Sequence, residues 1–180
     1  MANLLTAMRL LLVVPVSWAF ADPQLLPPAL LMGFLLIAIA TDYFDGKLAR
    51  ATHTESARGM LFDHGTDFIF VTSALAAMAS VDVIHPILPV LITIAFSQYV
   101  LDSYFLFRAK QLRMSFLGRW NGIFYFVPLL CFAASRLEFM AGSASSLGEV
   151  TELLGLALIL STVASIVDRG LAPFHGLPRK

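Results

Sequence analysis

The chain has 180 residues, of which 58% are hydrophobic and 13% are charged, and its mean hydropathy is +0.81. Soluble domains have an apolar share of about one half and a charged share of about one quarter, so this composition excludes an ordinary soluble globular domain. Twelve basic residues balance twelve acidic ones. Nucleic-acid-binding proteins carry a clear basic excess, so we expect no nucleic-acid partner.

Apolar stretches of roughly 20 residues, the length that crosses a bilayer, follow one another along the chain. They predict six transmembrane helices, at residues 4–21, 25–44, 60–81, 84–107, 116–135 and 148–167. The third stretch is the least apolar, because Asp63, His64 and Asp67 lie in its first turns. We therefore predict an all-α fold in which residues 1–180 form one domain, an integral membrane bundle of six transmembrane helices.

The positions of lysine and arginine predict the orientation of this bundle, since these residues collect on the cytoplasmic side of a membrane. If residues 45–59 are cytoplasmic, eleven of the twelve basic residues lie inside and Arg136 alone lies outside. Both termini are then cytoplasmic as well. We expect a multi-pass protein, in the inner membrane of a bacterium, whose polar loop 45–59 faces the cytoplasm.

An alternative interpretation of the opening segment is a cleaved signal peptide. The triplet Ala19-Phe20-Ala21 resembles a signal-peptidase site. A signal peptide has its basic residue before the apolar run, however, whereas Arg9 follows Leu4 and Leu5. Removal of the segment would also leave five spans and spoil the charge asymmetry, so we favour a transmembrane helix.

Four aspartates, Asp42, Asp45, Asp63 and Asp67, lie at the ends of the second and third apolar stretches. Residues three or four apart share one face of a helix, so each pair is expected on a single face. The short connection between the two helices predicts that they are antiparallel and adjacent. The two carboxylate pairs should then face each other.

These carboxylates need compensating positive charge, because an aspartate costs about 2.5–3.5 kcal/mol at the centre of a membrane helix. Lys47 and Arg50 fall on other faces of the helix, and Arg58 lies beyond the loop. Two divalent cations would balance four negative charges, and carboxylate oxygens favour Mg²⁺, Mn²⁺ or Ca²⁺ over zinc. A two-metal site of this kind suits in-line displacement at phosphorus.

Two glycines and an arginine near the acids fit the same chemistry. Gly46 removes a side chain next to Asp45, so a ligand can approach closely there, and Gly59 gives similar clearance at the start of the third helix. Arg50, one turn after Gly46, can pair with a phosphate or stack on a base.

The stretch from Asp42 to Asp67 resembles the signature of the CDP-alcohol phosphotransferases, DxxDGxxARx8GxxxDxxxD, at all eight fixed positions. The opening NLLTAMR, residues 3–9, is also similar to the start of many phospholipid-synthesising members. This resemblance implies six spans and a class I membrane enzyme of phospholipid biosynthesis. Such an enzyme transfers the phosphatidyl group of CDP-diacylglycerol to the hydroxyl of a small polar alcohol and releases CMP.

The resemblance also implies roles for individual residues. The metal ligands, for two Mg²⁺ or Mn²⁺ ions, would be Asp42, Asp45, Asp63 and Asp67. Asp67 would in addition be the catalytic general base that deprotonates the acceptor. The CDP pocket would be formed by Asp45, Gly46, Ala49, Arg50 and Gly59.

The acceptor is less well determined by the sequence. Phosphatidylglycerophosphate synthases commonly read D-P-x-A-D-K at the second aspartate pair, whereas residues 63–68 here read DHGTDF. A phosphorylated acceptor needs fixed positive charge near the metals, and Arg119, Arg113 and Arg108 are the candidates, although they also satisfy the positive-inside rule. We expect glycerol 3-phosphate first, then inositol phosphate, then inositol, serine or choline.

Several assignments stay open at this point. Asp102 is either a functional acid or a partner of Arg9 or Arg169, and His64 is expected to be a surface or packing residue. Small residues at positions 74–80 predict close helix contact, within one subunit or across a homodimer. Two other classes compete with the main hypothesis: an intramembrane prenyltransferase and a cation transporter. The former lacks the Gly46 to Arg50 pattern, and the latter would spread its acids through the membrane depth.

Overall fold

The computed structural model describes residues 2–51, 57–101 and 116–171. These residues are helical apart from short turns and contain no strand, as predicted. The elements in chain order are α1 (Ala2–Ala21), α2 (Pro28–Ala51), α3 (Ala57–Ser80), α4 (Ile87–Leu101), α5 (Phe116–Phe124), α6 (Phe126–Ser135), the 3-10 helix η2 (Glu138–Ser143) and α7 (Ala144–Leu171).

The predicted apolar stretches correspond one by one to these helices. The stretch at 116–135 is divided into α5 and α6, which follow each other end to end with only Tyr125 between them. The largest difference is at α2, where the apolar stretch ends at residue 44 but the helix continues to Ala51, as the expected placement of Asp42 and Asp45 on one helix face requires. The aspartate-rich signature therefore begins within a continuous helix. Residues 102–107, the end of the fourth predicted span, lie outside the described residues.

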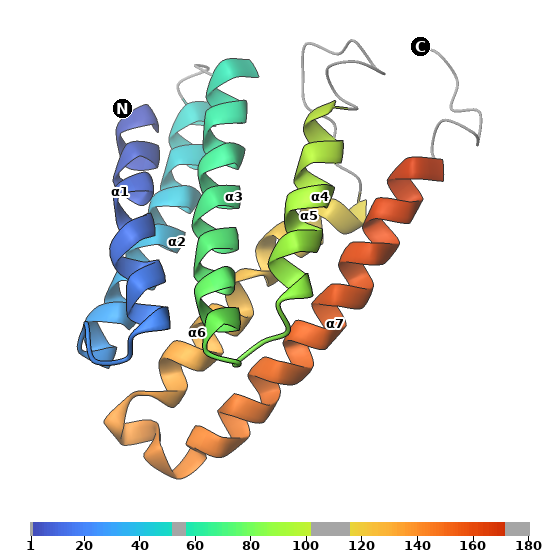
Figure 1. Cartoon of the computed structure of the whole chain (residues 1–180). Helices are drawn as coiled ribbons and strands as arrows, with labels where there is room; N and C mark the ends of the chain where they lie inside the picture. The colour runs from blue at the N-terminus through green and yellow to red at the C-terminus, as the bar shows by residue number, and fades with distance from the viewer. Residues whose placement is uncertain (1, 52–56, 102–115, 172–180) are drawn as a thin grey trace.

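Successive helices run in alternating directions, with α5 and α6 together forming one rod (Figure 1). The start of α1 and the end of α7 consequently lie at the same end of the bundle, drawn at the top of Figure 1. A chain that runs through a bundle an even number of times begins and ends on the same side of it. The side of a membrane that this end faces stays a prediction.

Two segments of the described chain are long and apolar enough to cross a membrane, Phe116–Ser135 and Glu138–Leu171. Shorter apolar helical segments occur at Thr6–Ala21, Pro28–Phe44 and Ile87–Leu101. Large apolar side chains, such as Leu11, Phe116 and Leu160, are exposed on the outside of the bundle. Because soluble monomers rarely expose such surfaces widely, these features indicate a membrane protein. The number of passes stays a prediction.

Helix α1 organises the half of the bundle that carries the aspartates. It packs extensively against α3 and also against α2, whereas α2 and α3 have few direct contacts in the described part of the chain. The two helices are antiparallel, as predicted, with α1 packed against both; side chains of α2 and α3 meet at one end of the bundle. The core between them includes Phe20 of α1, Leu35 of α2 and Phe70 of α3, all without exposed surface.

Candidate functional site

The three helices of this half each carry a stripe of buried or partly exposed side chains with the spacing i, i+4, i+7 and i+11, which lines one face of a helix. The stripes are Arg9, Val13, Val16 and Phe20 on α1; Leu31, Leu35, Ala38 and Asp42 on α2; and Asp63, Asp67, Phe70 and Ala74 on α3. In each stripe the apolar residues lie toward the middle of the bundle and the charged residues toward one end. The core positions thus continue directly into a cluster of charges.

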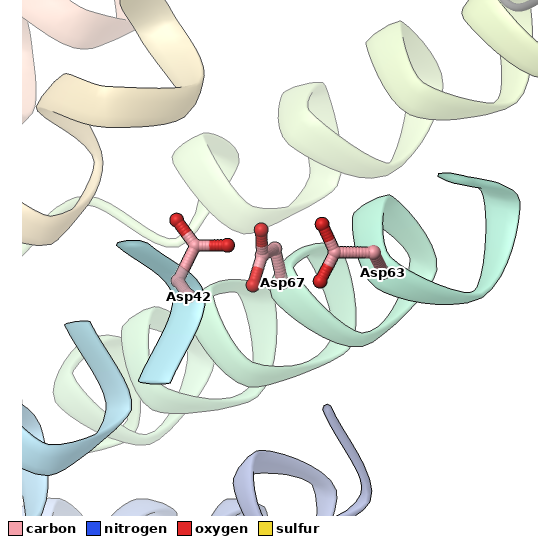
Figure 2. A group of neighbouring side chains, drawn as sticks. All are labelled: Asp42, Asp63 and Asp67. Carbon is pink, nitrogen blue, oxygen red and sulfur yellow. The ribbon is translucent and has the colours of Figure 1, made fainter. Parts of the chain in front are cut away.

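Three of the four predicted metal ligands converge at this end. One carboxylate oxygen from each of Asp42, Asp63 and Asp67 lies within 4.8 Å of the other two. Figure 2 shows Asp42 approaching from α2, while Asp63 and Asp67 come from neighbouring turns of α3. Their side chains are 44%, 28% and 29% exposed, respectively. The predicted convergence is confirmed for these three acids, which border both the core and the solvent.

Arg9 is the residue that the sequence interpretation missed. Its side chain is completely buried, and Nη2 lies 3.2 Å from Oδ1 of Asp42. Nη1 lies 3.4 Å from Oδ1 of Asp63 and forms an ion pair with Asp67. The sequence interpretation considered Lys47, Arg50 and Arg58 as nearby cations and did not consider Arg9. The sequence carried a signal for this contact, because Arg9 occupies the same buried stripe as Val16 and Phe20.

The remaining residues of the signature are only partly described. Asp45, Gly46, Ala49 and Arg50 lie in the last turns of α2, but their side chains are outside the described part of the structure. Gly59 lies in the first turn of α3 and is half-buried. Their assignment to a CDP pocket stays a prediction.

The predicted acceptor-binding arginines are placed only in part. Arg119 lies within α5 and is exposed. Arg108 and Arg113 lie outside the described residues, as does Asp102. An acceptor site built on these arginines, and a role for Asp102, stay predictions.

A group of aromatic residues joins α3 to α4 next to the acids, and Arg169 of α7 contacts it. The ring of His64 lies 6.2 Å from that of Tyr99, and the Arg169 guanidinium lies 5.2 Å from the Tyr99 ring centroid. Phe96 of α4 stacks on Phe68 of α3 at 4.2 Å. His64 thus packs against a neighbouring ring, one of the two roles expected from the sequence, and Tyr99 packs against His64, Phe96 and Arg169.

The acid cluster fits a divalent cation. Mg²⁺ binds oxygen at about 2.0–2.1 Å, so two oxygens on opposite sides of one ion are roughly 4.2 Å apart. The oxygens of Asp42, Asp63 and Asp67, within 4.8 Å of one another, need little movement to reach such an arrangement. Carboxylates are also the ligand type that Mg²⁺ and Mn²⁺ prefer.

A model of the CDP-alcohol phosphatidyltransferase family matches residues 1–167, so the chain belongs to this family. Searches of curated proteins and of solved structures found no match. Family membership identifies the protein as a transferase of substituted phosphate groups that acts in phospholipid biosynthesis. It also implies a CDP-alcohol substrate, a lipid environment and the use of divalent cations.

Proposed function

We propose that this chain transfers the phosphatidyl group of CDP-diacylglycerol to the hydroxyl of a small polar alcohol, with release of CMP. The observation that carries the proposal is the convergence of Asp42, Asp63 and Asp67, which are three of the acids in the family signature. In this proposal residues 1–180 form a single catalytic domain in a bacterial inner membrane. The acid end of the bundle faces the cytoplasm.

The metal site consists of Asp42, Asp45, Asp63 and Asp67, which hold two Mg²⁺ or Mn²⁺ ions. When bound, paired metals stabilise the attacking and leaving oxygens of a displacement at phosphorus. Two observations support this assignment: the spacing of the described carboxylate oxygens, and the position of the cluster at the end of the bundle rather than in its core.

Asp67 is the general base in this proposal. It accepts the proton of the acceptor hydroxyl, whose oxygen then forms a bond to the phosphorus that carries the diacylglycerol group. The bond between that phosphorus and the oxygen of CMP breaks, and CMP leaves. Gly46, Ala49, Arg50 and Gly59, with Asp45, form the pocket for the CDP group, because the glycines leave room for it and the guanidinium of Arg50 can pair with a phosphate.

For the acceptor we propose glycerol 3-phosphate, bound through its phosphate by Arg119, Arg113 and Arg108. Arg119 is exposed on α5, so its side chain is not enclosed in the core of the bundle. Inositol phosphate comes second, followed by the neutral alcohols inositol, serine and choline. Membership in this family is also compatible with a homodimer, and we propose one.

The test is a reconstitution with the full-length protein. Purified protein in detergent or nanodiscs is incubated with CDP-diacylglycerol, Mn²⁺ or Mg²⁺, and each acceptor separately; CMP release and the lipid product are measured by mass spectrometry. We expect phosphatidylglycerophosphate with glycerol 3-phosphate, and no CMP after chelation of the metal. A different lipid product would replace the acceptor assignment. CMP-releasing activity that survives complete chelation would overturn the metal mechanism.

A further inference from the structure

Arg9 lies inside the acid cluster rather than beside it. Its guanidinium contacts Asp42 on α2 and both Asp63 and Asp67 on α3, and its side chain has no exposed surface. Charges attract more strongly in a buried setting than in water. The guanidinium therefore compensates part of the charge that the three neighbouring carboxylates carry.

The hydrogen bonding of Arg9 is incomplete in this position. Nε and Nη2 are buried and have no hydrogen-bond acceptor, although Nη2 lies 3.2 Å from a carboxylate oxygen of Asp42. Buried donors without acceptors are costly. Of the three guanidinium nitrogens, Nη1 alone donates hydrogen bonds within the described residues, to Asp63 and Asp67. A cation of higher charge can therefore compete with the guanidinium for the same oxygens.

We propose that Arg9 is the resident counter-cation of the aspartate cluster. It positions Asp42, Asp63 and Asp67 before divalent cations enter, and it competes with those cations for the carboxylate oxygens. This inference rests on the proposed function, since it takes the three aspartates as metal ligands. It makes Arg9 a positioning residue, which acts through the carboxylates and sets the metal affinity of the site.

The affinity for Mn²⁺ alone tests the proposal without any substrate. Free Mn²⁺ is titrated by electron paramagnetic resonance against full-length wild-type protein, Arg9→Gln, Arg9→Lys and Arg136→Gln. Removal of a unit charge a few ångströms from the ligands should tighten Mn²⁺ binding in Arg9→Gln on the order of tenfold or more. Arg9→Lys keeps the charge and should stay closer to wild type. Arg136→Gln removes a distant arginine and should bind Mn²⁺ as wild type does.

The outcomes separate the inference from the proposed function. If Arg9→Gln binds Mn²⁺ with the affinity of wild type, or more weakly, Arg9 does not compete with the metal and the inference is overturned, while the metal site stands. If neither protein binds Mn²⁺, the metal assignment itself fails and the inference fails with it. Tighter binding in Arg9→Gln that is reversed in Arg9→Lys supports both.

Thermal unfolding with and without Mn²⁺ gives a second measurement. Metal-free Arg9→Gln should unfold at a lower temperature than wild type, and Mn²⁺ should raise its unfolding temperature by more than it raises that of wild type. If Arg9→Gln does not fold at all, Arg9→Gln/Asp67→Asn replaces it, because this double variant also loses one uncompensated negative charge. A double variant that folds better than Arg9→Gln supports charge compensation. One that folds no better contradicts it.

Discussion

Each end of the bundle has an arginine that reaches across to neighbouring segments, and the two arginines are bound in different ways. At one end Arg9 contacts three carboxylates, and two of its three guanidinium nitrogens lack a hydrogen-bond acceptor. At the other end Arg136, just after α6, donates from Nη1 to the carbonyl oxygen of Ala19 at 2.9 Å and from Nη2 to that of Pro23 at 2.5 Å.

This difference separates a structural arginine from one that belongs to a site. The carbonyls that Arg136 binds lie at the end of α1 and in the turn after it, where helical backbone acceptors have no partner within the helix. Arg136 therefore fixes the α1–α2 connection to α6. The partners of Arg9 are instead charged groups that a metal could also bind. Substitutions at the acid end should therefore reduce catalysis, and substitutions at the Arg136 end should reduce stability.

The largest effect is expected for Asp67→Asn at the acid end. The change keeps the shape of the side chain but removes the proposed base, and general-base catalysis contributes about 10²–10⁴-fold to a rate. CMP release from CDP-diacylglycerol should fall by a factor on the order of 10³ or more, as measured by mass spectrometry of the reaction. Glu149→Gln, an exposed acid on α7, is the matched control and should retain activity. Retention of activity by Asp67→Asn would remove the base from the mechanism.

At the opposite end, Arg136→Ala should reduce stability rather than catalysis. It leaves the carbonyls of Ala19 and Pro23 without their donor, and hydrogen bonds to charged groups contribute about 1.5–3 kcal/mol each. We expect a lower thermal unfolding temperature in detergent, with turnover per folded molecule close to wild type. A large loss of turnover per folded molecule, with little change in the unfolding temperature, would contradict the assignment of Arg136 to stability.

Much of this contrast was accessible from the sequence. The helices followed from apolar length, and the convergence of the acids followed from the spacing of residues 63 and 67 on one helix face. Arg9 was missed because the positive-inside rule counts arginines without asking which helix face they occupy. Its spacing from Val16 and Phe20 places it on the buried face of α1. The position of Arg9 on this buried face was therefore the feature of the sequence that could have predicted its contact with the acids.

The packing partners of the helices were harder to predict. The extensive packing of α1 against α3, its second neighbour in sequence, was not predicted. The choice depends on how side chains such as Phe20 and Phe70 interlock, which neither composition nor periodicity specifies. The acceptor-binding residues depend on packing in the same way, so three arginines on the expected side of the membrane do not determine an acceptor.

The smallest effect is expected between the two ends, at Tyr125→Phe. Tyr125 is buried between α5 and α6, and its hydroxyl lies 2.8 Å from Oγ1 of Thr162 on α7. The Thr162 hydroxyl already donates to the carbonyl oxygen of Leu158 at 2.6 Å, so Tyr125 must donate to Thr162. The phenylalanine keeps the ring and removes one hydrogen bond, with an expected loss of about 0.5–1.5 kcal/mol.

A loss of this size corresponds to a fall of a few degrees, roughly 2–4 °C per kcal/mol, in the unfolding temperature of a chain this long. Differential scanning fluorimetry in detergent measures it, and Tyr43→Phe, which changes an exposed ring on α2, should show no fall. Both Mn²⁺ affinity and CMP release should match wild type in Tyr125→Phe, because the hydroxyl binds a neutral partner away from the charged cluster. A change in Mn²⁺ affinity there would show that the metal site depends on the α5–α6–α7 packing as well as on Arg9, and the separation between the chemical and structural parts of the bundle would fail.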